Sequence, residues 1–328
     1  MAKPDLVRAA GIDCGTNSIR LLVADVDRAT GRLAEVARLM EVVRLGQGVD
    51  RTGWFAPEAL ERTLRRVDRF GHLCRELGAG PVRFVATSAT RDAANRNVLL
   101  DAVRAALGVE VDVVSGLEEA HLSFAGALSG LHSSPPGPKL CVDIGGGSTE
   151  LALGVSGPEQ SYSINLGCVR LTERYLHTDP PTEVELRAAT DAVNMALDAA
   201  EQVVDLGQTA VLVGLAGSVT TVTAQALDLD TYDPAVIDGT NLSVQQVLEA
   251  GRSLWTASRA ERAALPFMHP GRVDVIGGGA LIWAQVVQRA IKAVERQGGN
   301  LAWIVTSEHD ILDGITLSAA GCGPGQSE

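Results

Sequence analysis

Residues 141–150 read CVDIGGGSTE: an apolar run containing an aspartate is followed by three glycines, two hydroxyl residues and a glutamate. Glycine is unfavourable inside a helix or a strand, so three in succession predict a tight turn. The short apolar runs on both sides predict two strands, and the whole stretch is therefore predicted to be a β-hairpin. Without Cβ atoms, such a turn can gather several backbone N–H groups at one point, an arrangement that binds phosphate oxygens.

The same pattern occurs near the start of the sequence, where residues 9–26 read AAGIDCGTNSIRLLVADV. Three positions match when the copies are aligned: Asp13 with Asp143, Gly15 with Gly145, and Ser18 with Ser148. A repeated hairpin predicts two lobes built on one plan. A glycine turn stabilised by an aspartate explains one copy alone. Two copies, each with an aspartate before the turn and hydroxyls after it, favour phosphate binding.

Two other glycine signatures are absent. A P-loop needs G-K-[ST] at the start of a helix, and neither glycine turn is followed by a lysine. A dinucleotide fingerprint needs G-x-G-x-x-G between a strand and a helix, which neither stretch provides. Neither alternative therefore explains the repeated turns.

Composition limits the functional classes. The chain has 328 residues, 46% of them hydrophobic, which favours a globular protein of two domains. Its net charge of −12 argues against a general nucleic-acid binder. The five cysteines are scattered without a C-x-x-C pair, which is typical of reduced thiols. With no signal-peptide pattern and no run of ~18 apolar residues, we expect a cytoplasmic protein with neither membrane nor nucleic-acid partners.

Beyond the two hairpins, β-prone runs alternate with amphipathic stretches, which predicts an α/β fold. The expected elements are a helix from Pro57 to about 77, a strand over 81–89, a helix over 90–107 with Thr90 as N-cap, a strand ending at Val114 with a helix to 128, a turn and helix over 164–176, a helix over 182–204, a strand, turn and helix over 211–229, a strand, three glycines and a helix over 272–295, and a strand and helix over 303–320.

Residues 109–128 contain two adjacent glutamates. Ser115 and Glu118 have the S-x-x-E spacing of a capping box, which explains Glu118 without a function. Glu119 lies about 200° around the helix from Leu117 and is predicted to face away from the apolar stripe. In the first helical turn it should stay ionised, so it is a candidate general base. A solvated glutamate is the alternative.

Three further residues are candidates on local grounds. Arg91 follows a strand and begins a helix, a common anion site, although an ion pair with Asp92 explains it more simply. Gly217 and Ser218 form a third glycine–hydroxyl element that can offer amide donors, or Ser218 can simply cap a helix.

No pair of histidines has metal-ligand spacing. Carboxylates, phosphate oxygens and waters suit Mg²⁺ better than zinc.

Seven stretches in order resemble the exopolyphosphatase / guanosine pentaphosphate phosphohydrolase (Ppx/GppA) family over residues 10–317: GIDCGTNSIRLLVADV, VVRLGQGVDRTG, FVATSATRDAANR, VVSGLEEAHLSFAGAL, CVDIGGGSTELALG, NLGCVRLTERYL and VGLAGSVTT. The resemblance implies two ribonuclease-H-like lobes of the actin-like ATPase (sugar kinase/Hsp70/actin) superfamily, with a phosphate-binding cleft between them. We expect an N-terminal lobe of residues 1–122 plus 306–320, a C-terminal lobe of residues 123–305, and a disordered tail over 321–328.

The resemblance also implies a reaction: hydrolysis of terminal phosphate from inorganic polyphosphate or pppGpp, with Mg²⁺ (or Mn²⁺) and an activated water. The family's catalytic glutamate, the second of its G-x-E-E-A block, corresponds to Glu119, and the arginine of its T-x-R block to Arg91. The residues matching the family's acidic positions around the phosphates and metal are Asp13, Asp143 and Glu150. Those matching its phosphate contacts are Asn17, Ser18, Gly145, Gly146, Gly147 and Ser148, to which the local pattern adds Gly217 and Ser218.

Several alternatives stay open. The chain resembles the short, two-domain form of the family, and this form does not imply processivity on long polyphosphate. The sequence does not choose between polyphosphate and pppGpp, and a homodimer is compatible with the resemblance. An ATP-dependent kinase for a small metabolite belongs to the same superfamily, and a non-catalytic polyphosphate or (p)ppGpp sensor is a third reading. The matched acidic residues favour the hydrolase, because a pure binder gains nothing from carboxylates beside an anion.

Overall fold

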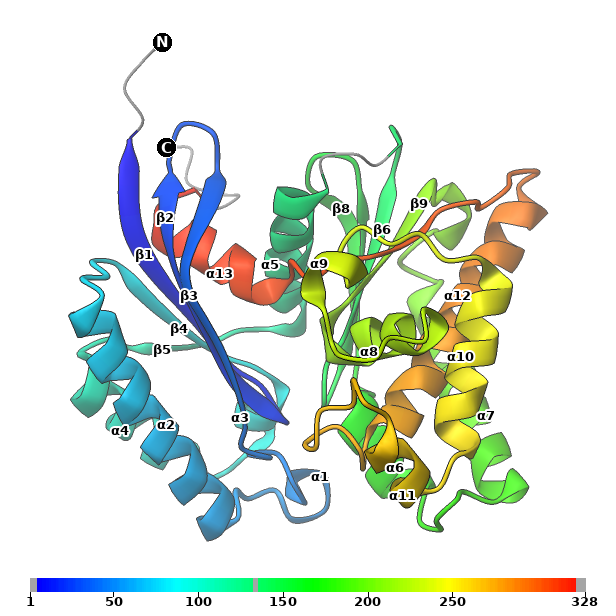
Figure 1. The fold of residues 1–328 in the computed structure, drawn as a ribbon, viewed down its shortest axis with the longest axis horizontal. Helices are drawn as coiled ribbons and strands as arrows, with labels where there is room; N and C mark the ends of the chain where they lie inside the picture. Colours follow the sequence, from blue (N-terminus) through cyan, green and yellow to red (C-terminus); the bar gives the residue numbers. More distant parts are fainter. Residues whose placement is uncertain (1–4, 132–134, 323–328) are drawn as a thin grey trace. The chain divides into compact units, whose positions relative to one another are not determined.

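The computed structural model describes residues 5–131 and 135–322. These residues form two compact units (Figure 1). Unit 1 comprises the chain up to Ser129 together with the chain from His309 onward, and unit 2 comprises Gly130–Glu308. Of the expected disordered tail, residues 323–328 lie outside the described part of the chain.

These boundaries differ by a few residues from the expected ones at 122/123 and 305/306. Helix α5 (Gly116–Gly130) continues without a break past residue 122. Its Gly126 packs so tightly on unit 1 that a Cβ there would lie 1.8 Å from the carbonyl oxygen of Asp310. The second half of α5 therefore belongs with unit 1.

Unit 1 is built on a five-stranded sheet in the order β3-β2-β1-β4-β5. The strands β1, β2 and β3 pair antiparallel, whereas β4 and β5 run parallel to β1. The bounds of these elements are β1 (Leu6–Cys14), β2 (Ser18–Asp27), β3 (Arg32–Val42), β4 (Val82–Ala86), β5 (Val111–Val113), α1 (Val49–Thr52), α2 (Pro57–Glu76), α3 (Ser88–Asp92), α4 (Asn97–Leu107), α5 and α13 (Ile311–Ala319).

The sheet of unit 1 is covered on both faces. Alternate residues of β1 point to opposite sides. Ile12 belongs to the core formed with α2 and α4, whereas Ala9 belongs to the core formed with α13. Figure 1 shows α2 and α4 on one side of this sheet and α13 on the other. Gly11 of β1 contacts Thr316, and a Cβ at Gly11 would lie 2.4 Å from the Thr316 hydroxyl.

Unit 2 repeats the plan with the strand order β10-β9-β6-β7-β8. Here β6, β7 and β8 are antiparallel, and β9 and β10 run parallel to β6. Read from the antiparallel edge, both sheets have the same order, which confirms the expected pair of ribonuclease-H-like lobes. The bounds are β6 (Lys139–Ile144), β7 (Thr149–Gly154), β8 (Pro158–Ile164), β9 (Val211–Leu215), β10 (Ile304–Thr306), α6 (Cys168–Tyr175), α7 (Glu183–Ala200), η1 (Leu206–Gln208), α8 (Ala216–Ala226), α9 (Pro234–Ile237), α10 (Val244–Thr256), α11 (Arg259–Ala264) and α12 (Ile276–Arg296).

Two expected elements were wrong. The run before the glycines at 277–279 is a set of turns rather than a strand, and the glycines form the first turn of α12. They allow α12 to approach its neighbours: a Cβ at Gly278 would lie 2.9 Å from the carbonyl oxygen of Cys168 in α6. The single helix expected over 90–107 is instead α3 and α4, and Thr90 lies inside α3 rather than at its N-cap.

Among the residues that the structure describes, no helix combines the length and the apolar character needed to pass through a lipid bilayer.

The N-terminus of α7 gives a prediction about stability and pH. Thr182 caps this helix, and the Glu185 carboxylate accepts hydrogen bonds from the N–H groups of Thr182 (2.8 Å), Thr178 (3.0 Å) and His177 (3.0 Å). Hydrogen bonds, first from the Thr178 hydroxyl and then from the Thr182 N–H, lower the pKa of Glu185 to about 2.

A carboxyl group with a lower pKa in the folded state stabilises the fold above its unfolded pKa, and that stabilisation is lost as the pH falls through the folded value. For Glu185 the loss runs from the ordinary value of 4.5 down to about 2. We expect Glu185→Gln to lower the urea midpoint relative to wild type at pH 7, and the difference to be smaller at pH 3, which lies inside this window. An equal difference at both pH values would contradict the role of the charge.

Candidate functional site

Each glycine turn joins the two strands of a hairpin. The two hairpins have the same register, but the residue opposite the aspartate differs between them. In unit 1, Asp13 on β1 lies directly opposite Arg20 on β2. In unit 2, Asp143 on β6 lies directly opposite Glu150 on β7. Directly opposite residues have Cβ atoms about 4.5–5.5 Å apart, so each pair interacts. The first hairpin therefore carries an acid–base pair and the second a pair of acids.

The turn of the first hairpin is closed by a hydrogen bond from the Gly15 N–H to the Ser18 carbonyl at 2.9 Å. The Asn17 carbonyl accepts the N–H groups of Val43 (3.0 Å) and Arg44 (2.8 Å), which fixes the chain after β3 against the turn. Asn17 and Ser18 are both half-buried. The structure thus places these two predicted phosphate contacts together at the end of β1.

Asp13 is held by Arg20. Its Oδ2 accepts hydrogen bonds from Nε of Arg20 at 2.9 Å and from Nη2 at 2.7 Å. Burial raises the pKa of Asp13, which is 5% exposed, and the Arg20 guanidinium acts in the opposite direction. The net pKa of Asp13 remains above its ordinary value. Asp13 therefore already has a cationic partner, unlike a carboxylate that depends on a metal for its compensation.

Glu119 and Arg91 form an ion pair. Nη1 of Arg91 donates to Oε2 of Glu119 at 2.8 Å and to the Val114 carbonyl at 2.8 Å. The simpler explanation for Arg91, a pair with Asp92, is replaced by this contact to the carboxylate. These residues follow β4 and β5, which run parallel beside β1, so they share with Asp13 the edge where parallel strands end. That edge is where ligands bind in open α/β sheets.

The expected orientation of α5 was wrong. Leu117 is 52% exposed, whereas Glu119 is 6% exposed and lies on the stripe that includes Leu122 and Gly126. This stripe is buried because Gly126 packs on Asp310 of unit 1. Glu118 behaves as a structural residue: its N–H bonds the Ser115 hydroxyl, and its carboxylate pairs with Arg83 at 2.7 Å. Both glutamates are paired, but only Glu119 is buried.

The turn of the second hairpin is oriented by α6. The Gly145 carbonyl accepts the Cys168 N–H at 2.9 Å, and the Gly146 carbonyl accepts the Val169 N–H at 2.9 Å. In a trans peptide the C=O of one residue and the N–H of the next point in opposite directions. The N–H groups of Gly146 and Gly147 therefore point away from α6. Two adjacent amides directed outward from a turn are a nest for an anion.

Ser148, directly after the three glycines, strengthens this interpretation. It is 2% exposed, and among the described residues its Oγ has no hydrogen-bond partner. Buried hydroxyls are nearly always hydrogen-bonded, so an exception points to a ligand or an ordered water. Ser148 thus supplies a third donor beside the two outward-pointing amides.

Asp143 and Glu150 are the carboxylates best placed for a cation. They are 6% and 1% exposed, and the Ser163 hydroxyl donates to Oε1 of Glu150 at 2.8 Å. No group of three or more His, Cys, Asp or Glu residues suited to a metal occurs in the described parts of the chain. Mg²⁺ is commonly held by only one or two carboxylates together with phosphate oxygens and waters. The pair therefore fits Mg²⁺ bound jointly with a phosphate.

Gly217 and Ser218 lie beside the second hairpin. Leu215, at the end of β9, is the parallel neighbour of Asp143, and the next residue, Ala216, has a left-handed φ of 66°. The Ser218 hydroxyl hydrogen-bonds the thiol of Cys168. Burial raises the pKa of this thiol above its ordinary value, and the bond to Ser218 offsets part of that rise. Ser218 lies within α8 and does not cap it. It therefore supports the start of α6, which in turn orients the glycine turn.

The structure thus gathers the predicted residues into one set in each unit. The unit 1 set is Asp13, Asn17, Ser18, Arg91 and Glu119, and the unit 2 set is Asp143, Gly145, Gly146, Gly147, Ser148, Glu150, Gly217 and Ser218. The sequence reasoning missed Arg20 and Cys168. Arg20 had a usable signal: it lies as far after the first turn as Asp13 lies before it.

Known proteins resemble this chain along nearly its full length. The model of the Ppx/GppA phosphatase family matches residues 22–301. Exopolyphosphatase 2 of Mycobacterium tuberculosis is 48% identical over 323 residues, which cover 96% of this chain and 99% of that protein. A solved structure described as an exopolyphosphatase-like protein is 44% identical with a TM-score of 0.92, covering 96% and 98% of the two chains. A Ppx/GppA family member from Aquifex aeolicus is 26% identical with a TM-score of 0.78, covering 96% and 98%.

Proposed function

This chain belongs to the Ppx/GppA phosphatase family, and we propose that it is an exopolyphosphatase, a phosphoanhydride hydrolase that releases terminal phosphate from inorganic polyphosphate. The near full-length relation to an exopolyphosphatase at 48% identity carries the proposal. Support comes from the buried carboxylates, from the outward-pointing glycine amides, and from the Ser148 hydroxyl, which has no hydrogen-bond partner in the part of the chain that the structure describes.

In unit 2, the Gly146 and Gly147 amides and the Ser148 hydroxyl bind phosphate oxygens of polyphosphate. Asp143 and Glu150 would hold Mg²⁺ (or Mn²⁺) together with the phosphate. The ion would supply positive charge that offsets the negative charge of the phosphoryl group. Preorganised donors of this kind stabilise developing charge without moving, which makes them effective in a water-poor site.

In unit 1, Glu119 is the general base. It accepts a proton from the attacking water as the oxygen of that water bonds to the terminal phosphorus. The bond from phosphorus to the bridging oxygen breaks, and polyphosphate shortened by one phosphate leaves. Arg91 holds the Glu119 carboxylate in place through the hydrogen bond at 2.8 Å.

The direct test is Mg²⁺-dependent phosphate release by the purified protein. Short-chain polyphosphate, long-chain polyphosphate and pppGpp are compared at equal concentrations of terminal phosphate. We expect release from polyphosphate. Release from pppGpp alone would make the protein a pppGpp 5'-phosphohydrolase, and binding of polyphosphate or (p)ppGpp without release would make it a sensor. ATP-dependent phosphorylation of a small metabolite would identify a kinase instead.

A further inference from the structure

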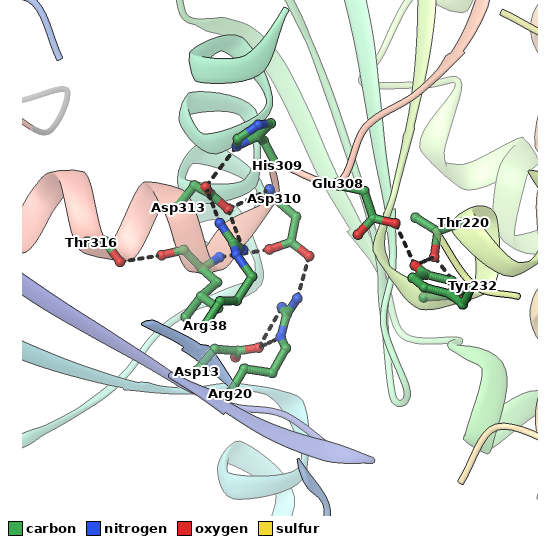
Figure 2. A network of polar contacts seen from close by, with 12 residues as sticks. Asp13, Arg20, Arg38, Thr220, Tyr232, Glu308, His309, Asp310, Asp313 and Thr316 are labelled. Atoms are coloured by element: carbon green, nitrogen blue, oxygen red, sulfur yellow. Dashed lines mark hydrogen bonds and ion pairs between the residues drawn. The ribbon is translucent and has the colours of Figure 1, made fainter. Parts of the chain in front are cut away.

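Arg20 connects Asp13 to a second buried carboxylate that the reaction above does not use. While Nε and Nη2 of Arg20 bind Oδ2 of Asp13, its Nη1 binds Oδ2 of Asp310 (Figure 2). Asp13 and Asp310 are 5% and 4% exposed. Among the described residues, both hydrogen bonds to the Asp13 carboxylate come from Arg20 and end on Oδ2. The pairing therefore leaves Oδ1 of Asp13 outside the ion pair.

Asp310 is itself fixed at the start of α13. Its Oδ1 accepts the Leu312 N–H at 3.0 Å, and its own N–H donates to Oδ2 of Asp313 at 3.2 Å. Asp313 is anchored by Arg38 at 2.8 Å and by Nδ1 of His309 at 2.9 Å (Figure 2). The position of Asp310, and through it that of Arg20, thus depends on the N-terminus of α13.

We propose that Asp310 is a positioning residue for Asp13, acting through Arg20. The inference rests on the proposed function and on the place of Asp13 in the unit 1 set of the candidate site. A planar guanidinium bound to two carboxylates through three nitrogens has its plane fixed. The plane fixes Oδ2 of Asp13, and therefore also the direction in which Oδ1 points.

Capping alone does not explain an aspartate at position 310. The cap needs only Oδ1, and serine or asparagine caps a helix about as well. The negative charge and the second oxygen serve Arg20, on a different element from the helix that is capped. Burying a charge is costly unless it is paired, so the Arg20 contact is the reason that the carboxylate is tolerated there.

A double-mutant cycle tests the proposal. Asp310→Asn keeps a carbonyl oxygen for the cap and removes the charge, and Arg20→Gln removes the connection to Asp13. With short-chain polyphosphate, we expect Asp310→Asn to lower kcat on the order of tenfold in the wild-type background, as befits one lost charged hydrogen bond, with KM changed little. In the Arg20→Gln background the same substitution should change kcat less than about twofold, because its path to Asp13 is already gone.

Asp233→Asn is the matched control. Asp233 caps α9 by accepting the Ala235 N–H at 3.0 Å. Its substitution should leave kcat at the wild-type value. Thermal unfolding of every variant separates loss of activity from loss of folded protein. Equal losses of kcat from Asp310→Asn in both backgrounds, or a lowered melting temperature with unchanged kcat, would overturn the proposal.

A crystal structure of Asp310→Asn tests the inference independently of activity. We expect the Arg20 guanidinium and the Asp13 carboxylate to rotate from their wild-type positions, and unchanged positions would refute the inference even if the protein proved inactive on polyphosphate. Failure of the proposed function has a different signature, since wild-type protein would then release no phosphate from polyphosphate.

Discussion

Glu119→Gln is expected to lower kcat for phosphate release by about 10²–10⁴-fold, the usual contribution of a general base. Glutamine has the same shape and keeps an acceptor for Nη1 of Arg91, which lies 2.8 Å from the carboxylate in the wild type. The folded structure should therefore persist while the ability to take a proton is lost. Steady-state kcat on short-chain polyphosphate measures the loss of activity. Circular dichroism and a melting temperature for each protein show whether the fold persists.

The neighbouring residue provides the control. Glu118 lies on the same helix, has an exposed side chain and pairs with Arg83 rather than with Arg91. Glu118→Gln should leave kcat within about twofold of wild type, as expected for a surface substitution away from the reacting groups. Wild-type turnover in Glu119→Gln, or a similar loss in both variants, would remove Glu119 from the role of base.

Asp143→Asn is expected to have the second large effect. It removes a charge from the pair of opposed carboxylates, Asp143 and Glu150. We expect the Mg²⁺ concentration for half-maximal activity to rise by at least about 10–100-fold, the loss that follows even removal of outer partners of a metal. Activity measured across a Mg²⁺ titration gives this value directly.

Asp13→Asn tests whether Asp13 and Asp143 have different roles. Because Arg20 already pairs with Asp13, this substitution should lower kcat while shifting the Mg²⁺ requirement much less than Asp143→Asn does. Asp191→Asn, at an exposed position of α7, should change neither quantity. A larger Mg²⁺ shift in Asp13→Asn than in Asp143→Asn would assign the cation to the first hairpin instead.

The hairpins could be predicted from sequence because a glycine turn is a local feature. Their register could also be predicted, since residues equally distant from the turn of a β-hairpin face one another. Asp13 with Arg20, and Asp143 with Glu150, follow from that symmetry alone. The pairing of Arg20 with Asp310 was not accessible, because the two residues are 290 positions apart and only the packing of α13 on β1 and β2 brings them together.

The errors also have physical causes. The run at 272–276 contains β-branched residues and favours a strand by propensity. The glycines that follow it allow a helix to pack closely on its neighbours, and these tertiary contacts override the strand propensity. On α5, Leu117 and Phe124 suggested one apolar stripe. Phe124 is buried, but Leu117 is exposed, and the helix also buries small residues such as Ser123 and Gly126. A pattern of large apolar residues does not reveal such a face.

The division of unit 1 into two chain segments has a consequence for the order in which the protein forms during synthesis. Unit 2 is one continuous stretch, Gly130–Glu308, and in the sequence it comes between the two segments of unit 1. The ribosome therefore completes all of unit 2 before it makes α13. Until then, Ala9, Leu22 and Val26 of the first sheet lack the helix that covers them. Unit 2 can fold as it emerges from the ribosome. In unit 1, by contrast, one apolar face of the sheet stays uncovered until α13 has been translated.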